Sequence, residues 1–178
     1  VATMNPIRSV TVDLDGTLLD TIADLAAAAN AMLRELGRPE YPLETVASFV
    51  GRGIPKLVAR CLPDLDEAAV ETAQAIFRRH YAIENGRCST IFPGVLDGLR
   101  AFREAGLPLA VITNKAAAFT EPLLAATQLG VWFNFAVSGD SLPEKKPHPM
   151  PLLHACQRMG TRPEENLHIG DSHHDAVA

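Results

Sequence analysis

The chain has 178 residues, of which 47% are hydrophobic and 21% are charged, and its formal net charge is −5 at pH 7. This composition supports one substantial hydrophobic core with a small additional domain, and it excludes a disordered chain. No basic field is present to attract nucleic acid, so an anionic ligand would have to be held by a few local cations or by a metal ion.

The cysteines and the hydrophobic segments bear on where the protein works. Cys61, Cys88 and Cys156 lie far apart and form no C-x-x-C pair, which is typical of reduced thiols in a cytoplasm. No segment reaches the ~20 apolar residues that a membrane helix needs, and the N-terminus lacks the apolar run of a signal peptide. We therefore expect a soluble, cytoplasmic protein with no membrane partner.

The first part of the chain predicts one strand followed by helices. Residues 7–13 are rich in β-branched side chains and stop at a Gly-Thr turn, as expected for a buried parallel strand. Residues 21–36 carry apolar side chains at helical spacing and end at Gly37. Further helical patterns follow, with no convincing strand between them, over residues 43–49, 55–61 and 66–83.

Strands and helices alternate after Pro93-Gly94. Helices are predicted over residues 95–105, 116–128 and 150–159, and strands over residues 107–113, 135–138 and 167–170. This alternation predicts an α/β fold with a doubly wound parallel sheet. The helical block of about 75 residues before it is too long for a crossover connection. We interpret residues 19–92 as an inserted all-helical cap domain, and residues 1–18 and 93–178 as the α/β core.

Acidic residues follow the first and last predicted strands. In open parallel sheets, ligands bind outside the carboxyl ends of the strands. Asp13 and Asp15 are separated by one residue, so in strand geometry both carboxylates lie on the same side and repel each other. Asp171 and Asp175 bring further negative charge from the last strand. A shared proton could relieve this repulsion, but Mg²⁺, which prefers oxygen ligands, is the simpler inference.

Four segments resemble the signatures of the haloacid dehalogenase-like hydrolases, in the order of that family and over essentially the whole chain. They are Asp13-Leu14-Asp15-Gly16-Thr17-Leu18-Leu19-Asp20, Val111-Ile112-Thr113-Asn114, Lys146-Pro147-His148-Pro149 and Gly170-Asp171-Ser172-His173-His174-Asp175. A single such motif would be weak support, whereas the ordered set is strong. The Pro93-Gly94 return point and the helical insertion resemble those of the phosphoglycolate phosphatase group within this family.

The resemblance implies a phosphatase mechanism centred on the first motif. Asp13 would be the nucleophile that forms an aspartyl-phosphate, with one oxygen on Mg²⁺. Asp15 would protonate the leaving alcohol and then activate water, with its backbone carbonyl on the metal. Members that remove halogens lack an aspartate at the position of Asp15, so its presence favours phosphoryl transfer.

The other three motifs imply the binding groups. The Thr113 hydroxyl and the Asn114 backbone N–H would bind the phosphoryl oxygens. Lys146 would neutralise both Asp13 and the phosphate. Asp171 would be a direct metal ligand, with Asp175 in or just behind the coordination shell.

Two cations of the insertion are candidates for contacting substrate. Arg52 lies between two glycines, and Lys56 follows Pro55 at a predicted helix start, where the helix dipole attracts anions. If the insertion is a lid, its closure would exclude water and bring these cations to the substrate. A solvated basic patch is the alternative interpretation.

The function expected from these residues is hydrolysis of a small phosphorylated metabolite, with 2-phosphoglycolate as the leading candidate. A sugar-phosphate or nucleotide phosphatase, or a β-phosphoglucomutase-like isomerase, would keep the same core residues. An inactive phosphate-binding or regulatory protein is the alternative outside the enzymes. Loss of Asp13 or Asp15 would have favoured this alternative, but both residues are present. We expect a monomer or a homodimer.

The chain stops at Ala178, three residues after Asp175. Family members normally continue through a helix and at least one more strand. We therefore expect this chain to lack part of the family's core, with lower stability and an exposed apolar edge.

Overall fold

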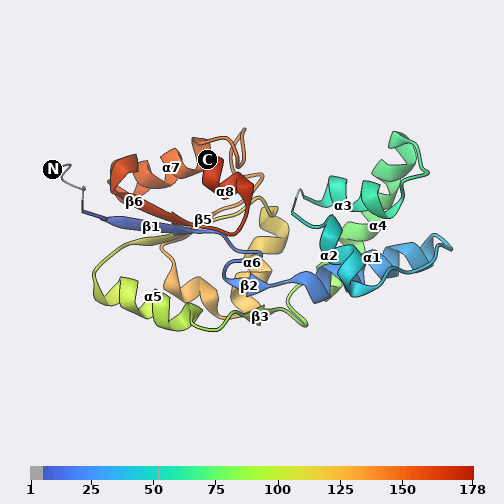
Figure 1. Cartoon of the computed structure of the whole chain (residues 1–178), viewed down its shortest axis with the longest axis horizontal. Coiled ribbons are helices and arrows are strands. Elements are labelled where there is room, and N and C mark those ends of the chain that lie inside the picture. The colour runs from blue at the N-terminus through green and yellow to red at the C-terminus, as the bar shows by residue number, and fades with distance from the viewer. Residues whose placement is uncertain (1–5, 52) are drawn as a thin grey trace. The chain divides into compact units, whose positions relative to one another are not determined.

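The computed structural model describes residues 6–51 and 53–178 and forms two compact units. The first unit consists of the chain up to Asp20 together with Ile91–Ala178, and the second of Thr21–Thr90. The second unit is helical and appears in light blue to green in Figure 1. The predicted role of residues 19–92 as a cap domain stays a prediction.

The first unit contains a four-stranded parallel sheet in the order β5-β4-β1-β6. Its strands are β1 (Ser9–Val12), β4 (Leu109–Ile112), β5 (Phe135–Val137) and β6 (Asn166–Ile169). The chain adds β4 and β5 on one side of β1 and then returns to place β6 on the other side. The strand order therefore reverses beside β1, and the carboxyl edge at such a reversal is where open α/β sheets bind ligands.

Outside the helices of the second unit, the described part of the chain contains further helices and short strands. They are β2 (Leu19–Asp20), β3 (Thr90–Ile91), α5 (Val95–Glu104), α6 (Ala117–Ala126), η1 (Leu129–Trp132), α7 (Met150–Met159), η2 (Pro163–Glu165) and α8 (His173–Val177). The predicted helix over residues 150–159 is confirmed at both ends. The two-residue strands β2 and β3, which pair with each other, were not predicted because two residues cannot show an alternating pattern.

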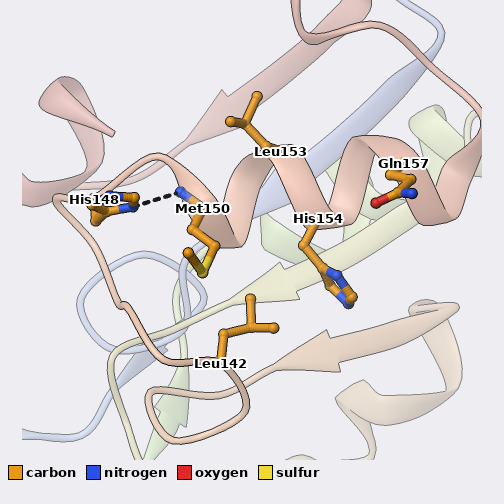
Figure 2. A pocket seen from close by; sticks show the side chains of 6 residues that line it. All are labelled: Leu142, His148, Met150, Leu153, His154 and Gln157. Carbon is orange, nitrogen blue, oxygen red and sulfur yellow. Dashed lines mark hydrogen bonds between the residues drawn. The ribbon is translucent and has the colours of Figure 1, made fainter.

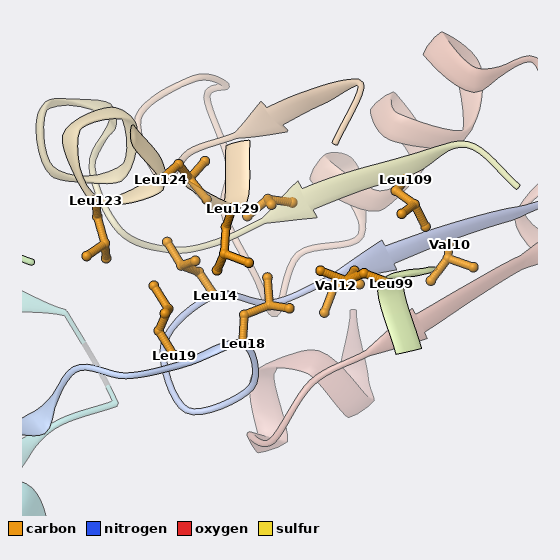
Figure 3. Close-up of a cluster of buried hydrophobic side chains, with 11 residues drawn as sticks. Val10, Val12, Leu14, Leu18, Leu19, Leu99, Leu109, Leu123, Leu124 and Leu129 are labelled. Atoms are coloured by element: carbon orange, nitrogen blue, oxygen red, sulfur yellow. The ribbon is translucent and has the colours of Figure 1, made fainter. Parts of the chain in front are cut away.

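One face of the sheet carries the main hydrophobic core. Val10 and Val12 of β1 pack there with Leu99 of α5 and Leu123 of α6, as Figure 3 shows. These side chains are almost fully buried, and they form the contiguous core that the sheet needs on this face.

The opposite face is covered by α7. Ala110 and Ile112 of β4 and Val137 of β5 pack there with Ala155 of α7. Figure 1 shows α7 and α5 on opposite sides of the sheet. Because helices cover both faces, the predicted doubly wound α/β fold is confirmed.

The second unit is built from four helices in its described residues. They are α1 (Ile22–Glu35), α2 (Leu43–Phe49), α3 (Ile54–Cys61) and α4 (Glu67–Glu84). The four helix predictions in this region are confirmed to within one residue at each end. α1 and α4 pack along each other, and Met32 of α1 and Phe77 and Tyr81 of α4 are buried. Asp66 caps α4 by accepting a 2.8 Å hydrogen bond from the Ala69 N–H.

A buried carboxylate connects the two ends of this helical unit. Asp24 in α1 is 1% exposed, and it accepts hydrogen bonds from the backbone N–H groups of Gly86, Cys88 and Ser89 at 2.8, 2.7 and 3.1 Å. The Ser89 hydroxyl donates to it as well, at 2.5 Å. A buried charge is tolerated only when it is hydrogen-bonded in this way. Asp24 therefore holds the returning segment against the first turns of α1.

Candidate active site

The carboxyl edge of the sheet gathers the predicted polar residues of the first unit. Asp13 directly follows β1, Thr113 follows β4, and Asp171 follows β6 by two residues. Lys146 comes from the segment between β5 and α7. Parallel strands end at the same edge, which is why residues far apart in the sequence meet here.

Lys146 is the centre of this arrangement. Its side chain is 2% exposed, and its Nζ lies 2.9 Å from Asp13 Oδ1. The same Nζ donates to Asp175 Oδ1 at 2.5 Å and to the Ile112 carbonyl at 2.7 Å. An ammonium group has three N–H donors, and all three have a partner here. The buried charge is thus compensated by two carboxylates, which is the condition for burying it.

Asp13 is a buried carboxylate whose protonation depends on its surroundings. Its Oδ1 accepts the backbone N–H of Leu14 at 2.8 Å as well as the Lys146 contact. Burial raises the pKa of Asp13 to about 6, with Lys146 opposing this shift and Asp175 adding to it. Above that pH the side chain is ionised, which is the state required of a nucleophile.

Asp175 holds its negative charge more firmly than Asp13. Its Oδ1 accepts hydrogen bonds from Lys146 and from His168 Nε2. Its Oδ2 accepts the Ser172 N–H at 3.0 Å and the Ser172 hydroxyl at 2.6 Å. Burial alone would raise the pKa of Asp175, but these donors, led by Lys146, hold it well below its usual range.

Three carboxylates lie close enough to bind one cation. Asp13, Asp171 and Asp175 each offer an oxygen within 4.8 Å of the others. Such an all-oxygen donor set fits a hard cation such as Mg²⁺. Gly16, with φ +83°, passes so close to Asp171 that a Cβ atom there would overlap its carboxylate. The Asp171 side chain is exposed and accepts a 3.0 Å hydrogen bond from Thr17 Oγ1.

Asp15 points to a different partner. Its Oδ1 lies 2.8 Å from Nζ of Lys115, a lysine whose side chain is 7% exposed. Sequence analysis gave Lys115 no role. The signal that could have identified it is its position directly after Thr113-Asn114, at the edge where Asp15 was expected.

Thr113 and Asn114 shape the loop after β4. Thr113 is 4% exposed, and its hydroxyl oxygen accepts the Lys115 N–H at 3.1 Å. Asn114 Nδ2 donates to the Lys146 carbonyl at 2.8 Å. The Asn114 side chain therefore links two of the predicted motifs by holding the backbone that carries Lys146.

Comparison with known proteins identifies the family. Residues 10–178 match the model of the haloacid dehalogenase-like hydrolases. The chain belongs to this family. It is 52% identical to a phosphoglycolate phosphatase of Nitrosospira multiformis over 180 residues, and 48% identical to one of Thiobacillus denitrificans over 178 residues. Each match covers 97% of this chain and 78% of the relative.

The fold of the hydrolase agrees with this assignment. The crystal structure of a predicted phosphoglycolate phosphatase from Haemophilus somnus 129PT matches it with a TM-score of 0.90 at 31% identity, over 98% of this chain and 81% of that one. The prediction of a hydrolase of this family, and of a phosphatase within it, is confirmed.

The described structure does not test the two candidates from the insertion. Arg52 lies outside the described residues. Lys56 lies in the first turn of α3 in the helical unit, and its side chain is exposed. Their roles in the hydrolase stay predictions.

His168 contacts the site, although it belongs to none of the four motifs. It lies in β6, and its Nε2 is 3.1 Å from Asp175 Oδ1. Burial lowers the pKa of His168, although the hydrogen bond to Asp175 opposes this shift. Its position three residues before Asp171, in the strand that leads to the last motif, could have indicated the contact.

A separate hollow lies beside α7 of the hydrolase. It has a volume of about 390 Å³, and Figure 2 shows Leu142 of the preceding segment facing α7 across it. It is lined by Leu142, His148, Met150, Leu153, His154 and Gln157. His148 Nδ1 accepts the Met150 N–H at 3.1 Å, which stabilises the start of α7. None of the predicted site residues lines this hollow, so it adds nothing to the candidate active site.

No helix in the described part of the hydrolase combines the length and the apolar character that crossing a membrane requires.

Proposed function

We propose that this hydrolase is a Mg²⁺-dependent phosphatase that converts 2-phosphoglycolate to glycolate and phosphate through an aspartyl-phosphate. The observation that carries the chemistry is the buried ion pair between Asp13 and Lys146 at the carboxyl edge of the sheet, 2.9 Å apart. The substrate is proposed from the phosphoglycolate phosphatases of Nitrosospira multiformis and Thiobacillus denitrificans, which this chain resembles along most of its length.

In the first step, an Asp13 oxygen attacks the phosphorus atom. A bond forms between that oxygen and phosphorus, and the bond from phosphorus to the glycolate oxygen breaks. Asp15 gives its proton to the leaving oxygen, so glycolate departs with a neutral hydroxyl group in place of an alkoxide. Lys146 is already in contact with Asp13, and its charge offsets the negative charge that collects on the phosphoryl group.

In the second step, water attacks the phosphorus atom of the aspartyl-phosphate. Asp15 takes a proton from this water, the bond between Asp13 and phosphorus breaks, and inorganic phosphate leaves. The Thr113 hydroxyl and the Asn114 backbone N–H hold the phosphoryl oxygens during both steps. Splitting one difficult displacement into two is the general benefit of a covalent intermediate.

Asp13, Asp171 and the Asp15 backbone carbonyl would hold Mg²⁺, with Asp175 at or just behind the metal. When bound, the ion would supply positive charge that lowers the repulsion between the carboxylates and the phosphate. Asp175 already accepts two hydrogen bonds at each oxygen. This favours the position behind the metal, where Asp175 holds Lys146.

The helical unit is proposed to act as the cap, with Arg52 and Lys56 contacting the carboxylate of 2-phosphoglycolate. Arg52→Ala should then raise KM for 2-phosphoglycolate by about 10-fold while leaving KM for p-nitrophenyl phosphate within about 2-fold, because only the first substrate carries the carboxylate. Equal effects on the two substrates would contradict the cap assignment.

The remaining parts of the proposal concern the setting of the enzyme. We expect it to work in the cytoplasm on a small phosphorylated metabolite, without nucleic acid, as a monomer or a homodimer. Sedimentation of the purified chain would decide between the two states, and a larger assembly would contradict both.

The experiment that tests the proposed function is release of inorganic phosphate from 2-phosphoglycolate with and without Mg²⁺. Asp13→Asn should lower kcat by about 10³-fold or more, because the amide is a poor nucleophile. The matched control is Asp97→Asn, which removes an exposed carboxylate on α5 of the same unit and should leave kcat unchanged. Activity without Mg²⁺, or activity that survives Asp13→Asn, would show that the mechanism is wrong.

A further inference from the structure

One face of β1 and β6 carries polar side chains where a hydrophobic core would be expected. Ser9 and Thr11 alternate with Val10 and Val12 along β1, and both polar residues are fully buried. The register places Ser9 beside Asn166 and Thr11 beside His168. Because side chains of one strand alternate between faces, all four lie on the face opposite the main core.

These side chains form one continuous chain of hydrogen bonds. Ser9 Oγ bonds Thr161 Oγ1 at 2.9 Å and donates to Asn166 Oδ1 at 2.9 Å. Asn166 Nδ2 donates to Thr11 Oγ1 at 2.9 Å. Thr11 Oγ1 lies 2.9 Å from His168 Nδ1, and His168 Nε2 lies 3.1 Å from Asp175 Oδ1. This series of hydrogen bonds thus ends on Asp175, the carboxylate that holds Lys146.

The Ser9 and Asp175 ends decide the donor and acceptor roles along this series of hydrogen bonds. The Ser9 hydroxyl hydrogen goes to Asn166, so Thr161 must donate to Ser9. Thr11 accepts from Asn166, and its own hydroxyl hydrogen is free to go to His168 Nδ1 when that nitrogen carries no hydrogen. A neutral ring that accepts at Nδ1 carries its hydrogen on Nε2. That hydrogen points at Asp175, which as a carboxylate can only accept.

We propose that His168 is a positioning residue for the candidate active site, held as the Nε2–H tautomer by Thr11 so that it orients Asp175 and, through Asp175, Lys146. This inference rests on the proposed function for its effect on turnover. The packing supports it: a Cβ atom on Gly170 would overlap the Asp175 carboxyl group, so the carboxylate is tightly confined. Groups that orient a ligand or a charge partner from behind in this way typically matter about 10- to 100-fold for activity.

The test compares two substitutions that differ in which ring nitrogen they replace. The amide nitrogen of His168→Gln can reach the Nε2 position and donate to Asp175. The shorter amide of His168→Asn reaches only the Nδ1 position and leaves Asp175 without this donor. We expect His168→Asn to lower kcat for 2-phosphoglycolate by about 10-fold with KM within about 2-fold, and His168→Gln to recover most of that loss. His154→Gln, in the hollow beside α7, is the matched control.

Thermal melting distinguishes a role of His168 in positioning Asp175 from a role in packing alone. Both amides leave the volume of the imidazole ring partly unfilled, so we expect both to lower Tm by similar amounts while only His168→Asn loses turnover. If the two variants have equal kcat, or if kcat simply follows Tm across the set, His168 only fills space and the inference is wrong.

The tautomer itself can be observed without any activity. Long-range ¹H–¹⁵N spectra of the labelled chain at pH 7.5 report which ring nitrogen carries hydrogen, and the His168 signals are those absent in His168→Gln. The inference requires a neutral Nε2–H ring in the wild-type chain and a change of this pattern in Thr11→Val. A ring with hydrogen on Nδ1, or a charged ring, would overturn it. Failure of the wild-type chain to release phosphate would instead contradict the proposed function.

Discussion

Replacing the nucleophile Asp13 by asparagine should make the metal-free chain more stable at alkaline pH. Both described contacts of Asp13, from Lys146 and from the Leu14 N–H, go to Oδ1. The carbonyl oxygen of asparagine can accept both at the same place. The substitution therefore removes a buried charge while keeping its hydrogen bonds, and Lys146 keeps Asp175 as its ion-pair partner.

The size of the effect follows from the pKa of Asp13. Burial raises this pKa from 3.8 to about 6. The folded chain thus binds a proton more tightly than the unfolded chain, so stability is lost as the pH rises through this interval. At pH 8 the ionised carboxyl costs the folded state about 3 kcal/mol, at 1.36 kcal/mol for each pKa unit. At pH 5, where the folded carboxyl is mostly protonated, the cost is about half as large.

The assay is urea unfolding of the wild-type chain and of Asp13→Asn in EDTA at pH 5 and pH 8. We expect the variant to gain up to about 3 kcal/mol in the free energy of unfolding at pH 8 and clearly less at pH 5. Asp97→Asn, which removes an exposed carboxylate, should change stability by no more than about 0.5 kcal/mol at either pH. A variant less stable than the wild type at pH 8, or a gain that grows as the pH falls, would refute the reasoning.

Three further substitutions test other parts of the structure. Lys146→Met leaves two buried carboxylates without their cation, so urea unfolding at pH 8 should show a loss of about 3–5 kcal/mol; a loss below about 1 kcal/mol would mean that the ion pairs contribute little. Gly16→Ala places a Cβ atom on the Asp171 carboxylate at a positive φ, so it should lower the free energy of unfolding by about 1–2 kcal/mol or more. It should also weaken Mg²⁺ binding in a calorimetric titration, and unchanged binding would show that Asp171 is not a metal ligand. Asp24→Ala removes the buried acceptor of three backbone N–H groups and should destabilise the helical unit by about 3 kcal/mol in the same unfolding assay. An unchanged midpoint would show that water replaces the carboxylate.

Helices were predictable because their patterns are local. Gly37 follows the last residues of α1, and the N-cap Asp66 precedes α4, so start and stop signals lie within a few residues of the helix ends. The short helix α8 was not predicted, because its five residues are too few to show a 3.6-residue period.

The first three strands were predicted in the right places but too long, and the last, predicted over residues 167–170, has the predicted length but begins one residue earlier, at Asn166. The predicted strand over residues 7–13 shrinks to Ser9–Val12, because Asp13 already belongs to the turn that carries the site. The apolar run shows where a buried strand lies, whereas the pairing partners on both sides decide where its ladder ends.

Some residues of the site could be predicted from the sequence, whereas the contacts between them could not. Asp13, Thr113, Lys146 and Asp171 could be proposed from the sequence because strand ends and family motifs mark their positions along the chain. The pairing of Asp15 with Lys115, 2.8 Å apart, could not, because the two residues are 100 positions apart in the sequence.

The sequence by itself determined that this protein has a parallel sheet with acidic residues and a lysine at its carboxyl edge, since apolar runs and the polar residues that end them are local properties of the chain. Only the tertiary structure decided that Lys146 is shared between Asp13 and Asp175, and that His168 supports Asp175 from a buried polar chain. The physical reason is register: the alignment of β6 against β1 chooses which side chains meet, and a shift by one residue would turn His168 to the other face of the sheet.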